Sequence, residues 1–145
     1  MATTTSNRNP IILIDDDRED IEIFQEAFKE LGIENEIIVF TDGNKFYDYI
    51  STTDRNSFFV FCDINMNGLS GFQLQKKIFD NEAIRFKCIP FLMLSTSGAP
   101  ASVLEAYSHN VQGYFIKPNS ISAIKEMFEI VIKYWSISQR PASAQ

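Results

Sequence analysis

Acidic side chains follow two of the apolar runs in the chain, at the point where each run ends. Asp15, Asp16 and Asp17 follow the first run, and Asp63 follows the most apolar one. Carboxylates about 4 Å apart repel by on the order of 4 kcal/mol at an effective dielectric near ~20. Carboxylate oxygens with no imidazole or thiolate among them favour a hard cation such as Mg²⁺. We therefore expect Asp15 and Asp16 to bind a divalent cation rather than to be solvated loop acids, and Asp17 to cap the helix that follows.

A hydroxyl group and an ammonium group follow two later apolar runs. Ser95 comes directly after 91–94, and Lys117 comes directly after 114–116. A carboxylate beside bound magnesium is a competent nucleophile toward phosphorus, which is the role we expect of Asp63. Ser95 could donate a hydrogen bond, and Lys117 could supply positive charge, to the oxygens of a transferring phosphoryl group. Singly, the two could be a turn residue and a surface charge; together with the acidic cluster they indicate phosphoryl transfer.

Five strand-like runs alternate with five helical patterns, and this alternation predicts where the polar groups lie. Strands that alternate with helices form right-handed βαβ units around a parallel sheet. The sequence predicts an α/β fold, with a five-stranded parallel sheet of order 2-1-3-4-5 and helices on both faces, the flavodoxin-like doubly wound arrangement. Ligands bind beyond the carboxyl ends of such strands, so the polar groups should converge. The expected strands are 11–14, 37–40, 58–62, 91–94 and 114–116, and the expected helices are 21–31, about 46–50, one capped by Ser70 and Gln73, 100 to about 109, and 121–135.

Length and composition indicate one folded domain. A chain of 145 residues suits a single domain, which we place at 10–137 between flexible segments at 1–9 and 138–145. A net charge of −6, without clustered Lys and Arg, argues against a nucleic-acid surface. No apolar stretch approaches the ~18–20 residues that cross a bilayer, and the first residues lack the apolar core of a signal peptide. We expect a cytoplasmic protein with no nucleic-acid or membrane partner.

The cysteines agree with that location. Cys62 lies inside an apolar run and Cys88 just before another, and no CxxC pair exists. We expect two free thiols, buried or half-buried, in a reducing compartment.

The sequence resembles the receiver domain of two-component response regulators, including the stand-alone chemotaxis regulator. The similarity extends from about Pro10 to Trp135. Four segments carry it: the first strand with its acidic residues (11–17), the segment 61–66 followed by Gly71, the strand 89–95 that ends in a hydroxyl residue, and 113–118 with its Lys-Pro pair. The resemblance implies a cis peptide bond before Pro118.

The resemblance also implies a role for each residue of the site. Asp63 would be the phosphoacceptor. Asp15, Asp16 and Asp63, together with the backbone carbonyl of Asn65, would hold Mg²⁺. Lys117 would contact the phosphoryl group.

A switch follows from the same resemblance. Ser95 would also contact the phosphoryl group, and Tyr114 would reorient as Ser95 moves. The helix that begins at Pro100, the strand 114–116 and the last helix would then present an altered face to a partner. Candidate contacts on this face are Tyr107, His109 and Lys125.

The implied partners are proteins. A sensor histidine kinase or a phosphotransfer protein would donate the phosphoryl group, and an unknown protein would be the downstream target. The chain would be a monomer or a phosphorylation-dependent dimer. No enzymatic activity is expected beyond catalysis of its own phosphorylation and dephosphorylation.

Two positions depart from the family pattern. Asn67 stands where the family usually has proline, and Thr96 stands where a very small residue is common. Thr96 could narrow access to the site, which bears on the lifetime of the phosphoryl group rather than on the reaction.

Three other functions remain as alternatives. A haloacid-dehalogenase-like phosphatase would use Asp15 as its nucleophile and Asp17 as the second acid, although Arg18 and Glu19 stand where that family has a hydrophobic residue or threonine. A receiver-like docking module that takes no phosphate would lack one of the polar positions. A flavodoxin-like FMN binder is the weakest alternative, because three aspartates after the first strand would repel the phosphate of the cofactor.

Overall fold

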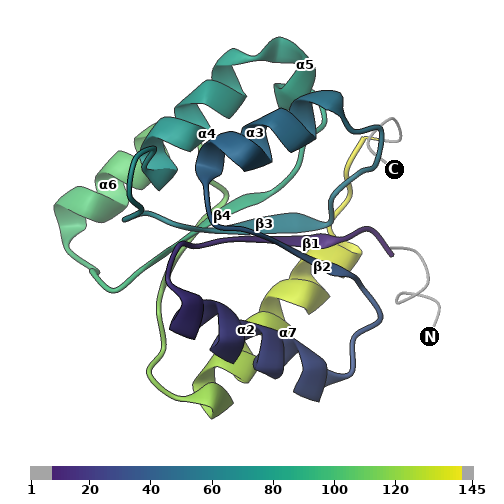
Figure 1. The fold of residues 1–145 in the computed structure, drawn as a ribbon, viewed down its shortest axis with the longest axis vertical. Coiled ribbons are helices and arrows are strands. Elements are labelled where there is room, and N and C mark those ends of the chain that lie inside the picture. Colours follow the sequence, from purple (N-terminus) through teal and green to yellow (C-terminus); the bar gives the residue numbers. More distant parts are fainter. Residues whose placement is uncertain (1–7, 142–145) are drawn as a thin grey trace.

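A parallel sheet between two layers of helices forms the molecule (Figure 1). The structure is a computed structural model and describes residues 8–141. The strands are β1 (Ile11–Ile14), β2 (Ile37–Phe40), β3 (Phe59–Asp63), β4 (Phe91–Ser95) and β5 (Gly113–Ile116). The helices are α2 (Arg18–Leu31), α3 (Gly43–Thr52), α4 (Gly71–Asp80), α5 (Glu82–Arg85), α6 (Pro100–Ser108) and α7 (Ile121–Ile137). The strand order is β2-β1-β3-β4-β5, so the predicted α/β class and topology are confirmed.

Successive side chains of a strand point to opposite sides of the sheet. The strands are continuous apolar runs, so both faces of the sheet are apolar. Helices α2 and α7 cover one face, and α3, α4, α5 and α6 cover the other (Figure 1). On the first face, the rings of Phe28 and Phe128 stack with their centroids 4.0 Å apart. On the second face, Phe46 and Leu74 are buried in a cluster with the strand residue Met93. Two closely packed layers therefore hold the strands rigidly in place.

The register of the sheet brings the ends of four strands to one edge. Ile14 pairs with Cys62, and Ser95 pairs with Ile116. The residue that follows β1 therefore lies level with the last residue of β3, and the residue that follows β5 lies one position past the last residue of β4. This edge carries the polar side chains that the sequence singles out.

Side-chain caps fix where two of the helices begin. The Asp17 carboxylate accepts hydrogen bonds from the backbone N–H groups of Glu19 and Asp20, as expected of an N-cap. Ser70 and Gln73 form the predicted capping box at the start of α4. Both helices thus begin immediately after the edge that carries the polar residues.

Three local features differ from the expectations. Helix α5 has only four residues, too few to show a helical period in the sequence, and the Asn81 side chain caps it. Cys88 is exposed rather than buried or half-buried, because the chain turns there with φ +55° before β4 begins. None of the peptide bonds in the described part of the chain is cis, so the bond before Pro118 is trans, the form that most X–Pro bonds adopt.

The two ends predicted to be flexible lie largely outside the described residues, which begin at residue 8 and end at residue 141. Within the second segment, Arg140 donates hydrogen bonds to the backbone carbonyls of Ser57 and Phe58. The domain limits of 10–137 stay a prediction. None of the helices described between residues 8 and 141 is long and apolar enough to cross a membrane.

Candidate functional site

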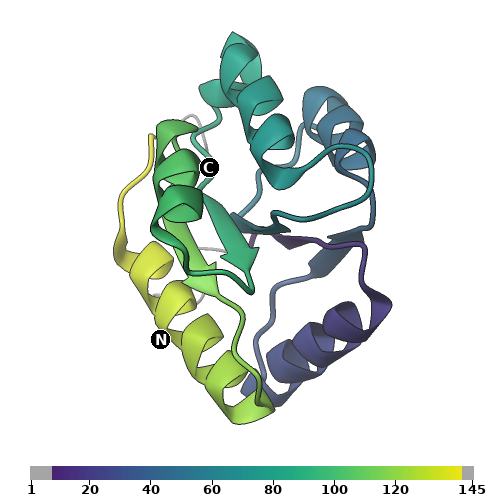
Figure 2. The same cartoon turned by 90° about the vertical axis from the view of Figure 1, so that its left-hand side faces the viewer.

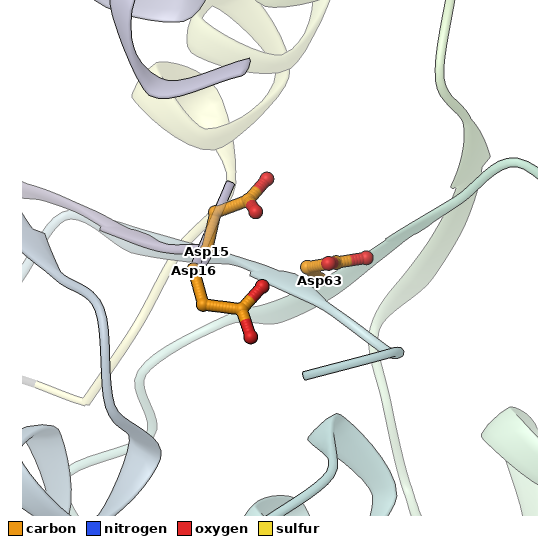
Figure 3. A group of neighbouring side chains, drawn as sticks. All are labelled: Asp15, Asp16 and Asp63. Carbon is orange, nitrogen blue, oxygen red and sulfur yellow. The ribbon is translucent and has the colours of Figure 1, made fainter. Parts of the chain in front are cut away.

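Three carboxylates meet at the carboxyl edge of the sheet. Figure 3 shows Asp15 and Asp16 at the end of β1 and Asp63 at the end of β3. One ligand oxygen from each of the three lies within 4.8 Å of the others. Asp15 is fully buried, Asp63 is 6% exposed and Asp16 is half-buried. The arrangement therefore places negative charge where water cannot fully solvate it.

Backbone N–H groups hold two of these carboxylates. Asp15 Oδ1 accepts a hydrogen bond from the N–H of Asp17 at 2.9 Å. Asp16 Oδ2 accepts one from the N–H of Asn67 at 2.8 Å, which joins the end of β1 to the loop between β3 and α4. Proline has no N–H, so the departure at position 67 gives Asp16 a partner that the usual family residue could not supply.

The ammonium group of Lys117 contacts three acidic side chains. Its Nζ atom lies 2.8 Å from Asp20 Oδ2, 3.2 Å from Asp15 Oδ2 and 3.4 Å from Asp63 Oδ1. Burial acts to lower the pKa of Lys117, but the hydrogen bond to Asp20 and the three negative charges outweigh it and raise the pKa above its ordinary value. Lys117 is therefore a fixed positive charge beside Asp63.

Asp20 is a contact of the site that sequence reasoning missed. It lies in the first turn of α2, where acidic residues are common because their negative charge interacts favourably with the positive end of the helix dipole. Its contact with Lys117 joins residues 97 positions apart. Nothing in the local sequence distinguishes such a residue from a solvated helix acid.

The buried carboxylates of Asp15 and Asp63 hold protons more tightly than ordinary aspartates. Burial is the largest influence on Asp15 and, against the Asp17 N–H and Lys117, raises its pKa to about 6. Burial also raises the pKa of Asp63 above its ordinary value, although Lys117 and the N–H of Asn65 act to lower it. The protein groups around the site thus do not fully stabilise its negative charge.

The donor set fits a hard divalent cation. Carboxylate oxygens from Asp15, Asp16 and Asp63 are the ligands such cations prefer, and two of the three are buried. A cation at this position would stabilise the ionised forms that burial disfavours. The fourth expected ligand, the carbonyl of Asn65, stays a prediction; Asn65 itself is exposed and next to the site.

Ser95 and Tyr114 are linked through one backbone residue. Ser95 is 2% exposed at the end of β4, and its Oγ atom accepts a hydrogen bond from the N–H of Ser97 at 3.0 Å. The carbonyl of Ser97 accepts a hydrogen bond from the Tyr114 hydroxyl at 2.5 Å. A change at the Ser95 hydroxyl can therefore reach the Tyr114 ring through Ser97. The intervening Thr96 is exposed.

The candidate partner contacts lie on α6, at its C-terminal end and on α7. Tyr107 is 51% exposed on α6. His109 ends α6, where its ring stacks on Phe72 with centroids 5.5 Å apart. Lys125 pairs with Glu30 at 3.1 Å and so joins α7 to α2. Of the three, Tyr107 presents the most apolar surface to a partner.

Comparison with known proteins agrees with the geometry. The chain matches the family model of the response regulator receiver domain over residues 11–129. It is similar to chemotaxis protein CheY-3 of Vibrio cholerae, at 30% identity over 88% of this chain and 95% of that protein. It is also similar to the probable methanogenesis regulatory protein FilR2 of Methanothrix harundinacea, at 28% identity over 86% of this chain and 82% of that one. Among solved structures, response regulator RPA3017, in red light signaling of R. palustris, superposes with a TM-score of 0.82 at 25% identity, covering 92% of this chain and 99% of that one.

Proposed function

Because this chain belongs to the response regulator receiver family, we propose that it is a single-domain response regulator whose Asp63 accepts a phosphoryl group. The observation that carries the proposal is the surroundings of the Asp63 carboxylate. It is nearly buried at the carboxyl edge of the sheet, with Lys117 Nζ at 3.4 Å and two further carboxylates nearby. Such a site combines a nucleophile, a positive charge and a place for a cation.

The chemical step forms one covalent bond to the protein, between an Asp63 oxygen and phosphorus. An oxygen of ionised Asp63 attacks the phosphorus atom of a phosphohistidine on a sensor kinase or phosphotransfer protein. The P–N bond breaks, the departing imidazole takes a proton from solvent, and Asp63 becomes an acyl phosphate. Lys117 supplies positive charge next to the new phosphoryl oxygens, and Ser95 supplies a hydroxyl donor at the end of the neighbouring strand.

Asp15, Asp16, Asp63 and the carbonyl of Asn65 are the groups that would hold Mg²⁺. Once bound, the ion would neutralise charge on the transferring phosphoryl group. The raised pKa of Asp15, to about 6, supports this assignment because the chain's own groups leave part of the negative charge unbalanced. A carboxylate set of this kind suits Mg²⁺, which binds through one or two carboxylates and keeps several waters.

Phosphorylation would switch a surface on the adjacent elements. The acyl phosphate replaces one negative charge at Asp63 by about two, and it attracts Ser95 and Lys117. If Ser95 moves, its hydrogen bond to Ser97 and the hydrogen bond from Tyr114 to Ser97 would shift the Tyr114 side chain. This shift would change the face formed by α6, β5 and α7, which lie next to one another (Figure 2). The exposed apolar residues of these three elements include Leu104, Tyr107, Ile116 and Ile121, and they favour a protein partner.

A response-regulator role also implies protein partners, a cellular location and an oligomeric state. The relatives include a chemotaxis protein and a probable methanogenesis regulator, so different outputs accompany one receiver fold. We therefore propose a histidine kinase or phosphotransfer donor and a protein target, and no particular pathway. A cytoplasmic protein that is a monomer, or a dimer when phosphorylated, is consistent with this role.

The phosphatase alternative is not favoured. It requires Asp17 to act with Asp15, but the Asp17 carboxylate is exposed and caps α2. The docking-module alternative is not favoured either, because it would lack one of the polar residues, and all five are present: Asp15, Asp16, Asp63, Ser95 and Lys117. Neither alternative accounts for the position of Lys117 beside Asp63.

Intact mass spectrometry tests the proposal. After incubation with Mg²⁺ and acetyl phosphate, the wild-type protein should gain one phosphoryl group, and Asp63→Asn should gain none. Asp15→Asn should react more slowly, because it retains the nucleophile and loses a cation ligand. An adduct that persists in Asp63→Asn but disappears in Asp15→Asn would support the phosphatase, and no adduct in any form would support a docking module.

A further inference from the structure

Lys117 makes its shortest acidic contact with a residue outside the acidic cluster of Asp15, Asp16 and Asp63. Its Nζ atom is 2.8 Å from Asp20 Oδ2 but 3.4 Å from Asp63 Oδ1. We propose that Asp20 is a positioning residue that draws the Lys117 ammonium toward α2 and competes with the phosphoryl group for it. This inference rests on the proposed function, since it concerns how strongly Lys117 engages a phosphorylated Asp63.

Asp20 occupies a fixed position on α2. Its backbone N–H donates to the Asp17 cap at 3.3 Å, and α2 packs along α7 through the stacked rings of Phe28 and Phe128. A short carboxylate on a packed helix cannot follow Lys117 far if the lysine moves toward Asp63. The Asp20 contact must therefore weaken as the Lys117–phosphoryl contact forms.

Lys117 is also restrained at its backbone, so only its side chain can move. Its N–H donates to the carbonyl of Ser95 at 2.8 Å, which holds it at the end of β5. Its side chain is 11% exposed and that of Asp20 is 30% exposed, so water screens their attraction only in part. The free energy needed to separate Lys117 from Asp20 therefore opposes phosphorylation.

Asp15 cannot have the same effect, although it also contacts Lys117. It belongs to the acidic cluster with Asp63 and stays beside the phosphoryl group after transfer. Lys117 can keep its contact with Asp15 while it approaches Asp63. Asp20 is outside the cluster, and so it is the contact that is given up.

The affinity of the protein for beryllium trifluoride, which mimics a phosphoryl group on a carboxylate, tests the proposal. With saturating Mg²⁺, Asp20→Asn should bind the anion about threefold to fivefold more tightly than wild type, the size expected for one partly screened ion pair. Glu19→Gln is the matched control, because it removes one carboxylate from the same helical turn without contacting Lys117. It should stay within about twofold of wild type. Asp20→Glu, which restores a carboxylate, should bind less tightly than Asp20→Asn.

The outcomes distinguish the role of Asp20 from the phosphorylation of Asp63. Equal or weaker binding by Asp20→Asn than by Glu19→Gln overturns the role of Asp20. Failure of the wild-type protein itself to bind the anion contradicts the proposed function instead. A thermal unfolding curve for each variant shows whether the fold is intact, and Asp20→Ser provides a second test if Asp20→Asn unfolds.

Discussion

Asp15 links the chemistry of the site to the stability of the protein. Its side chain is fully buried, and burial raises its pKa to about 6 from an ordinary value of 3.8. Between these two pH values the folded protein binds more protons at Asp15 than the unfolded chain does. The contribution of Asp15 to stability is therefore most favourable below about pH 4 and is lost as the pH rises through 6.

Asp15→Asn should consequently stabilise the protein most at neutral pH. We compare the free energies of unfolding of Asp15→Asn and wild type in the absence of divalent cations. The difference in favour of the variant should increase by on the order of 1–3 kcal/mol from pH 4 to pH 7. Urea unfolding at a series of pH values measures this difference. Glu19→Gln controls for the loss of an exposed charge. A difference that stays constant with pH would show that Asp15 is not destabilised by burial.

Excess Mg²⁺ should reduce or reverse this advantage, because a bound cation stabilises the ionised form of Asp15. The same variant thus gains stability while it loses cation affinity. Buried charge at a functional site commonly has this opposing effect on stability and function.

Residue type and position predicted most of the site. Each of its residues lies at the end of a strand or just after one, and all lie at one edge of the sheet: Asp15, Asp16, Asp63, Ser95 and Lys117. The contacts made by Asp20 and by the backbone of Ser97 were not predictable. Both depend on which side chain a distant residue meets, which sequence spacing does not determine.

The loop between β3 and α4 supports the site at the scale of elements. Asn67 in this loop donates its N–H to Asp16, and the N–H of Gly71 donates to the carbonyl of Ile64 at 2.9 Å. A side chain at position 71 would come within 2.7 Å of the carbonyl oxygen of Asp63. Glycine therefore allows α4 to begin directly against the end of β3.

Replacement of Asn67 tests whether the loop orients Asp16. Asn67→Pro removes the N–H that Asp16 accepts, whereas Asn67→Ala keeps it. We expect Asn67→Pro to bind Mg²⁺ several-fold more weakly than Asn67→Ala, because a cation ligand loses the hydrogen bond that orients it. Isothermal titration calorimetry measures the two affinities. Equal affinities would mean that the hydrogen bond does not matter for cation binding.

Element boundaries show what sequence patterns can and cannot locate. The strands were predicted to within one residue at either end, because continuous apolar runs mark strands buried on both faces. The long helices followed from their apolar stripes and caps. Helix α5 and the exposed turn at Cys88 were missed, since a four-residue helix has no period to detect and a turn at φ +55° has no glycine to signal it.

The strand order determines the site at the scale of the whole molecule. β1 and β3 are neighbours although α2, β2 and α3 separate them in the chain, and this pairing sets Asp15 beside Asp63. The order was predictable from the alternation of strands and helices and from the handedness of their connections. The same order places β5 at the edge of the sheet, next to α6 and α7 (Figure 2). One end of the sheet therefore holds both the acidic cluster and the start of the proposed switch.

The central claim is that Asp63 is the carboxylate that attacks phosphorus, and chemical trapping tests it most directly. The wild-type protein is incubated with Mg²⁺ and acetyl phosphate and then reduced with borohydride, which converts an acyl phosphate to an alcohol. Tandem mass spectrometry of the peptides locates the product. We expect homoserine in place of Asp63 alone. Homoserine in place of Asp15, or an unmodified Asp63 in protein that carries phosphate, would contradict it.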